Sequence, residues 1–268
     1  MQALDTTHVR SCLAAIIVAA STSLATAQTT DLLADSTQWT QYYQSGSGSI
    51  LTVPTTGSNQ LWYKTTTTSE SDYASIYSAK LPAGKDWSIQ SSIFINPGVP
   101  LPKYGDFVYM FFGVSPRSDL PGSRITYAFE YGRWNAGVGF STEVEAYNAG
   151  TELVTGLTSP RDLLPIIALR MDYSATDRSI TFLYDRDAEG TSYSWESQGA
   201  LSLASYWLSK DNEFTIVLGG SSSGTTLGWE ALYRTATASI AIPEPSTTAG
   251  LLGLAALAVV VARRRFRH

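Results

Sequence analysis

Histidine and cysteine are almost missing from this chain of 268 residues. The two histidines, His8 and His268, lie near its ends, and the single cysteine, Cys12, lies in an apolar run near the N-terminus. Ser-His-Asp and Cys-His catalytic groups, and zinc sites with nitrogen or sulfur ligands, are therefore excluded from the main body of the chain. The sequence also lacks a GxxxxGK[ST] phosphate loop and a GxGxxG turn opening a helix.

Charged residues are few as well, at 15%, whereas hydrophobic residues make up 44% and aromatic residues 12% of the chain. With many Tyr, Trp, Gly, Ser and Thr, this composition indicates an ordered, β-rich extracellular protein. It argues against a disordered chain or a coiled coil.

The N-terminus has the pattern of a secretory signal peptide. Arg10 precedes an apolar run from Cys12 to Ala20, and Ala25-Thr26-Ala27 supplies small residues at the positions that signal peptidases require. We predict a signal peptide over residues 1–27, cleaved after Ala27. The alternative is a buried helix of the folded domain.

The C-terminal tail has three parts in order. They are the motif Pro243-Glu244-Pro245, an apolar run from Ala249 to Ala262, and the basic residues Arg263, Arg264, Arg265 and Arg267. The prolines make a stiff, non-helical spacer. The apolar run predicts a transmembrane helix over residues 248–262, with the arginines on the cytoplasmic side.

This tail, residues 243–268, closely resembles the PEP-CTERM sorting domain of Gram-negative bacteria that make extracellular polymer. The resemblance implies export across the inner membrane, transient anchoring there, and processing near Pro243-Glu244-Pro245 by an exosortase-type membrane protease. The protein would then reach the cell surface or the extracellular matrix. The alternative, a plain C-terminal anchor, does not explain the Pro-Glu-Pro motif.

Removing both ends leaves residues 28–242 as one predicted domain. Arg10 and the four tail arginines leave 13 of the 18 basic residues, and Asp5 and Glu244 leave 21 of the 23 acidic ones, so the formal charge is −8. Nucleic acid and anionic membrane surfaces are therefore not expected as partners.

Apolar and polar residues alternate with a period of two along much of this domain, which predicts half-buried β-strands. The clearest stretches are residues 87–95, 125–131, 167–173, 180–184, 214–218 and 229–233. The stretch Asp106 to Val114 is apolar throughout and predicts a central strand covered on both faces. Many strands without crossover helices indicate an all-β, antiparallel two-sheet sandwich.

The order of these segments resembles the concanavalin A-like lectin/glucanase jelly roll over most of residues 35–240. The most recognisable pieces are the hairpin SITFLYDRDAEGTSYSW and the late segment EFTIVLGGSSSG. The resemblance implies a jelly-roll fold but no particular activity.

Glu143, Glu145, Tyr147 and Asn148 form one candidate ligand site. Jelly-roll glycoside hydrolases of the laminarinase and cellobiohydrolase types, which this stretch resembles, carry Glu-x-Asp-x-x-Glu on one strand. Glu143 would match the nucleophile and Glu145 the assisting acid, but Asn148 falls at the acid/base position, and an amide cannot supply the proton. The alternatives are contact with a sugar, or the polar face of an exposed strand.

Asp185, Asp187 and Glu189 nearly fit the spacing of a calcium-binding loop. The flanking segments alternate like strands, so a β-hairpin turn is the competing interpretation. Calcium is therefore one expectation for this segment beside the hairpin turn, and we expect no other cofactor.

Seven tryptophans add a third signal, because sugars stack on aromatic rings while sandwich cores also use them. Trp134, near Gly132 and Gly137 in an expected loop, is the best candidate for exposure. Trp87 and Trp229 continue apolar faces and are expected in the core.

We therefore expect an exported surface or matrix protein without enzymatic activity that binds extracellular polysaccharide or forms part of the matrix. Two alternatives remain: a glycoside hydrolase or lyase using Glu143 and Glu145, and a purely structural surface protein.

Overall fold

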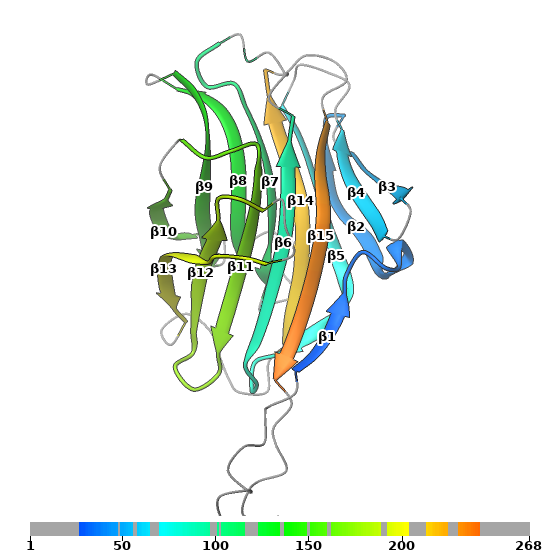
Figure 1. Ribbon diagram of the computed structural model, residues 1–268, viewed down its shortest axis with the longest axis vertical. Coiled ribbons are helices and arrows are strands. Elements are labelled where there is room, and N and C mark those ends of the chain that lie inside the picture. Colours follow the sequence, from blue (N-terminus) through cyan, green and yellow to red (C-terminus); the bar gives the residue numbers. More distant parts are fainter. Residues whose placement is uncertain are drawn as a thin grey trace, which may run out of the picture. The chain divides into compact units, whose positions relative to one another are not determined.

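The computed structural model shows two β-sheets that pack face to face (Figure 1). The structure describes residues 27–47, 49–55, 58–64, 70–96, 101, 103–115, 123–134, 137–148, 151–159, 162–188, 192–203, 213–224 and 230–241. The sandwich is one compact unit, Thr29–Ile240, and residues 1–28 and 241–268 fall in a second unit. The predicted helix over 248–262 and all of the predicted signal peptide except Ala27 lie outside the described residues. Within these residues, no helix is long and apolar enough to cross a membrane.

One sheet, named here the back sheet although it lies nearer the viewer in Figure 1, has eight strands among the described residues. In spatial order they are β13 (Glu196–Ser202), β12 (Ser179–Asp185), β11 (Ile166–Ser174), β6 (Trp87–Ile95), β15 (Glu230–Ala241), β4 (Ser58–Lys64) and β3 (Ser49–Thr55), with β1 (Ala27–Asp31) paired to β15. The strand pairs whose register is defined in this sheet are antiparallel.

The other sheet, named the front sheet, has seven strands in the described part of the chain. Their order is β10 (Thr151–Thr158), β9 (Gly137–Asn148), β8 (Arg124–Trp134), β7 (Phe107–Ser115), β14 (Glu213–Ser223), β5 (Ser71–Pro82) and β2 (Trp39–Ser45). A short 3-10 helix, η1 (Ser36–Gln38), precedes β2. These pairs are antiparallel too, so the predicted all-β antiparallel sandwich is confirmed.

The period of two decides which side chains fill the core. Successive side chains of a strand point to opposite faces. In β8, Ile125, Tyr127 and Phe129 are fully buried between the sheets, whereas Arg124 and Glu130 on the other face are only partly buried. The outer face of β8 therefore carries Arg124 and Glu130 as partly buried charged side chains.

The central strand β7 corrects one expectation. It lies between β8 and β14 as predicted, and Val108 and Met110 are fully buried in the core. Its other face is not covered at every position, because Phe107 and Tyr109 are half-buried and line hollows on the outer surface. The expected cover on both faces is wrong there.

Three polar side chains of the back sheet reach across the core to the front sheet. The Tyr63 hydroxyl donates to the carbonyl oxygen of Ser71 at 2.7 Å. The Tyr233 hydroxyl donates to the carbonyl oxygen of Phe111 at 2.5 Å. Gln198 donates through Nε2 to the carbonyl oxygen of Leu157 at 2.5 Å. These hydrogen bonds fix the sheets against each other.

The first and last strands of the sandwich are neighbours. The Thr29 and Ser239 hydroxyls lie 2.9 Å apart, and the Leu32 N–H donates to the carbonyl oxygen of Ala236 at 2.8 Å. The start of β1 and the end of β15 lie at the same end of the sandwich (Figure 1). Both ends of this unit therefore leave from the back sheet.

Candidate functional site

Three aromatic side chains form a row along the outer face of β7. Phe107 and Tyr109 are half-buried and Phe111 is buried, and all three lie on the face of the strand opposite Val108 and Met110. The ring centroids of Phe107 and Tyr109 are 5.8 Å apart, and those of Tyr109 and Phe111 are 5.7 Å apart. We call this row the aromatic ridge, and a hollow lies on each side of it.

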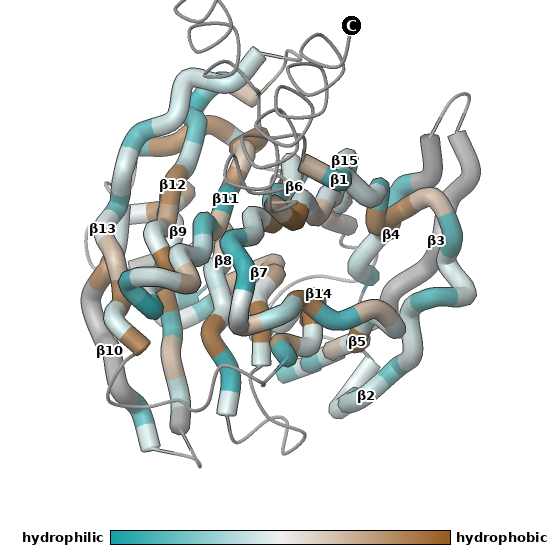
Figure 2. Tube along the Cα trace, turned by 90° about the horizontal axis from the view of Figure 1, so that it is seen from below, coloured by the Kyte–Doolittle hydropathy of each residue, from teal (hydrophilic) through white to brown (hydrophobic). Residues whose placement is uncertain are grey.

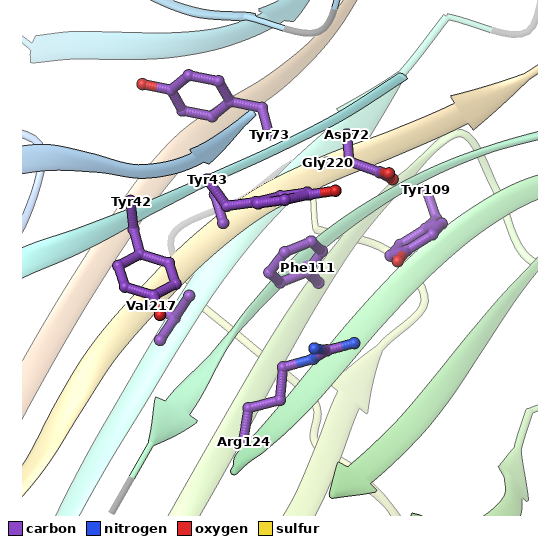
Figure 3. Close-up of a pocket in the computed structure, with 10 residues that line it drawn as sticks. Tyr42, Tyr43, Asp72, Tyr73, Tyr109, Phe111, Arg124, Val217 and Gly220 are labelled. Carbon is purple, nitrogen blue, oxygen red and sulfur yellow. The ribbon is translucent and has the colours of Figure 1, made fainter. Parts of the chain in front are cut away.

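The first hollow has a volume of about 270 Å³ and lies toward β2 and β5. We call it the aromatic hollow, because Tyr42, Tyr43, Tyr109 and Phe111 line it. The rings of Tyr43, Tyr109 and Phe111 surround a common space that the Arg124 side chain also faces (Figure 3). β2 lies beyond β5 on the side away from the back sheet (Figure 2), and its Tyr42 and Tyr43 line one side of the hollow.

Tyr42 and Tyr43 are unusually exposed for such large side chains. Their exposed fractions are 39% and 45%. Asp72 adds a carboxylate to the same hollow, where it accepts a hydrogen bond from the Ser45 hydroxyl at 3.0 Å. Exposed tyrosines beside a polar group can stack on an apolar ring face and also bind hydroxyl groups.

The position of Phe111 depends on a glycine in the next strand. A Cβ atom at Gly219 would lie 2.5 Å from Phe111 Cζ, so the ring occupies the space that a side chain would need. From below, the Tyr233 hydroxyl accepts a hydrogen bond from the Gly219 N–H at 3.1 Å and donates to the Phe111 carbonyl oxygen. The floor of the aromatic hollow is therefore fixed from both sides.

The second hollow, of about 200 Å³, lies on the β9 side of the ridge. We call it the acidic hollow, because its lining includes three carboxylates, Glu130 from β8 and Glu143 and Glu145 from β9, beside Phe107, Tyr109 and Ala128. Ala128 pairs directly with Glu143. Its small side chain leaves room between the carboxylates.

Burial and neighbouring charges perturb Glu145. Burial raises the pKa of its carboxyl; Arg124 opposes this, and Glu143 and Glu152 add to it. The Arg124 guanidinium lies 3.9 Å from Glu145 and 4.7 Å from the centre of the Tyr147 ring. Burial also raises the pKa of the Tyr109 phenol. That phenol is therefore neutral and can donate a hydrogen bond at physiological pH.

The structure thus brings together part of the site predicted on β9. Glu143, Glu145 and Tyr147 share the outer face of β9, and the two glutamates line the acidic hollow. Asn148 ends β9, where it pairs with Thr151, and its side chain lies outside the described residues. Trp134 ends β8 and pairs with Gly137, so its backbone is in a strand; its side chain is likewise not described.

Asp185, the first of the predicted calcium residues, ends β12, and Asp187 follows the strand. Asp185 accepts hydrogen bonds from the backbone N–H groups of Asp187 and Ser194, at 3.0 and 2.6 Å. Its carboxylate therefore organises the loop. Glu189 lies outside the described residues, and among those described no three His, Cys, Asp or Glu side chains lie together so as to hold a metal ion.

The tryptophans divide between the core and the surface of the sandwich. Trp87 is 3% exposed and stacks on Tyr173 with the ring centroids 5.0 Å apart, so its predicted core position is confirmed. Trp195 packs with Tyr193 on the outer face of the back sheet. Trp229 lies outside the described residues.

Several residues of both hollows were missed by the sequence reasoning. Tyr42 and Tyr43 lie on a strand without alternation, and Glu130 joins the glutamates of β9 only through strand pairing. The aromatic ridge did have a signal, because residues 107, 109 and 111 alternate within DFVYMFFGV. Because the whole segment is apolar, the sequence predicts a strand covered on both faces, and the partial exposure of this row does not follow from it.

Comparison with solved structures identifies the sandwich as a lectin-like fold. A peanut lectin with a nine-residue peptide matches with a TM-score of 0.50 and 12% identity, over 81% of this chain and 98% of that chain. A lectin UEA-II complexed with galactose matches with a TM-score of 0.50 and 12% identity, over 80% and 99% of the two chains. At this identity the likeness concerns the fold, that of legume and concanavalin A-like lectins.

The C-terminal residues provide the second identification. Residues 241–265 match the model of the PEP-CTERM protein-sorting motif, which confirms the resemblance seen in the sequence. Such a motif implies export and exosortase-mediated sorting to the cell surface. No curated protein sequence matches this chain significantly.

Proposed function

We propose that this is an exported surface or matrix protein that binds a polysaccharide on the outer face of its front sheet. The observation that carries the proposal is the aromatic ridge with a hollow on each side. Aromatic rings offer flat apolar surfaces, and the carboxylates and phenols beside them offer hydrogen bonds to hydroxyl groups. The aromatic hollow, about 270 Å³, is near the lower end of the range for small-ligand sites and suits a short stretch of a sugar chain.

The proposed partners are a membrane protease and a polysaccharide. An exosortase-type membrane protease would process the tail after export across the inner membrane of a Gram-negative bacterium. The protein would then meet polysaccharide at the cell surface or in the matrix. The PEP-CTERM motif supports the sorting step, and the geometry of the front sheet supports the binding step.

Substitution of ring side chains in the aromatic hollow tests the binding step. Tyr43→Ala removes an exposed ring, and we expect a loss of affinity of roughly threefold to tenfold for polysaccharide from the producing strain or for a positive glycan on an array. Tyr104→Ala is the matched control, because Tyr104 is 67% exposed and lines neither hollow. If full-length protein binds no glycan, or both variants lose affinity equally, the proposal is wrong.

Hydrolysis is the second candidate function, and Glu130 is the observation that favours it. The strand motif lacks an acid at Asn148, but Glu130 places a third carboxyl group in the acidic hollow beside Glu143 and Glu145. Burial raises the pKa of the Glu145 carboxyl, and a carboxyl group with a raised pKa can act as a general acid. Release of reducing sugar that Glu145→Gln abolishes would favour a hydrolase; binding without product would favour a lectin-like protein.

A further inference from the structure

Negatively charged side chains outnumber positively charged ones in the lining of the two hollows. Their described lining includes four carboxylates, those of Asp72, Glu130, Glu143 and Glu145, and one cationic side chain, that of Arg124. Arg124 lines the aromatic hollow and not the acidic one. Arg124 reaches Glu145 at 3.9 Å, so three carboxylates and one cation leave an excess of negative charge on the β9 side of the ridge.

In the acidic hollow, carboxylates lie close to aromatic rings. The Glu145 side chain is only 27% exposed, and the Glu143 side chain is half-buried on the same face of the same strand. Phe107 and Tyr109 border the carboxylates. A cation in this space gains attraction to several carboxylates and to the ring faces together.

An organic cation fits this lining better than a metal ion. Calcium needs six to eight oxygen ligands converging at about 2.3–2.6 Å. Among the described residues, no acidic side chains converge in that way, and half of the lining of the acidic hollow is aromatic or aliphatic. An ammonium group on a sugar ring offers charge to the carboxylates and an apolar ring face to the ridge.

We propose that the acidic hollow recognises protonated amino groups of a cationic polysaccharide, a polymer of hexosamine units that carry free amines. This inference rests on the proposed function and names the ligand class. Adjacent sugar units stack on the aromatic ridge, and Tyr109, which borders both hollows, positions the chain between them. Polymers of uronic acids are repelled by Glu130, Glu143 and Glu145.

Calorimetric titration of the full-length protein in detergent tests the ligand class. The probes are a glucosamine hexamer, its fully N-acetylated counterpart, a uronic acid hexamer and hexalysine, at pH 5.5 with a chelator present. We expect the glucosamine hexamer to bind roughly tenfold more tightly than the acetylated one. Glu143→Gln should reduce that preference roughly two- to fivefold.

Glu213→Gln is the matched control, since Glu213 is exposed and lies outside both hollows. It should leave the preference unchanged, and retained binding of the acetylated hexamer shows that a variant is folded. Equal binding of both sugar hexamers, tighter binding of the uronic acid hexamer, or equally tight binding of hexalysine overturns the inference while leaving the proposed function in place. Failure of every sugar to bind overturns both.

Discussion

At the scale of single residues, the acidic hollow includes one carboxyl group, that of Glu145, that is costly to ionise. Glu145 lies two residues from Glu143 on the same face of β9, and burial is the main cause of its raised pKa. Arg124 offsets this in part, at 3.9 Å. A partly exposed ion pair of this kind contributes little to stability, so the cost remains.

Glu145 should therefore make the protein more stable as the pH falls. Its carboxyl binds a proton more tightly in the folded than in the unfolded chain, whose pKa is near 4.5. Between pH 4.5 and the raised pKa, the folded state binds more protons than the unfolded state, so the free energy of unfolding increases as the pH falls through this range. Below pH 4.5 this carboxyl group adds no further pH dependence. We expect Glu145→Gln to raise the urea midpoint at pH 7 and to make little difference at pH 4.

Glu213→Gln serves as the comparison, because it removes the same charge from an exposed position. A stabilising effect of Glu145→Gln that grows as the pH falls would contradict the assignment of the raised pKa to the folded state.

At the scale of elements, side-chain hydrogen bonds between the sheets replace a disulfide. Gln198 of β13 joins three strands of the front sheet. Its Oε1 accepts from the hydroxyls of Tyr127 and Thr142, at 2.6 and 2.5 Å, and its Nε2 donates to Leu157 in β10. Gln198 thus closes one edge of the sandwich.

We expect Gln198→Leu to lower the free energy of unfolding by about 3 kcal/mol. The leucine leaves two hydroxyl groups and a carbonyl oxygen without this partner, and each unpaired buried group costs about 1–3 kcal/mol. Urea denaturation measures the loss. Gln41→Leu, in the exposed part of β2, should change stability by less than about 0.5 kcal/mol. Equal effects of the two changes would show that the Gln198 network is not a main contributor.

The sequence predicts the inner strands well and the edge strands poorly. β6 has the predicted bounds, and β8, β11 and β12 contain the predicted stretches, because each places one face in the core. β2 is at an edge and mostly exposed, so burial imposes no alternation on it. The aromatic hollow was missed with it, since Tyr42 and Tyr43 belong to that strand.

The site on β9 was predicted only in part for a related reason. The period of two places Glu143 and Glu145 on one face, and this is local information. The nearness of Glu130 and Tyr109 follows from the register of β8 with β9 and of β7 with β8. Register depends on the complete sheet, and it cannot be obtained from one strand.

At the scale of the whole molecule, the sorting motif and the proposed binding face occupy different parts of the chain. The PEP-CTERM motif covers residues 241–265, and the sandwich covers Thr29–Ile240. The two activities should therefore be separable by substitution.

Replacing Pro243-Glu244-Pro245 with three alanines should block tail processing. We expect the variant to accumulate in the membrane fraction with an increased mass, because the tail is retained, while its glycan binding is unchanged. Cell fractionation and mass spectrometry of the intact protein measure both effects, and Tyr43→Ala is the converse control, sorted normally but weak in binding. Unchanged location and mass would contradict exosortase processing.

The pairing of β15 also decides how the protein responds to force. β15 is hydrogen-bonded to β6 from Ala231 to Ile240, and its C-terminal end leads to the tail. A pull directed along β15 from this end loads its hydrogen bonds to β6 in shear, so that they share the tension. Hydrogen bonds loaded together resist far more tension than bonds peeled one at a time, so we expect β15 to stay paired with β6 when it is pulled along the strand.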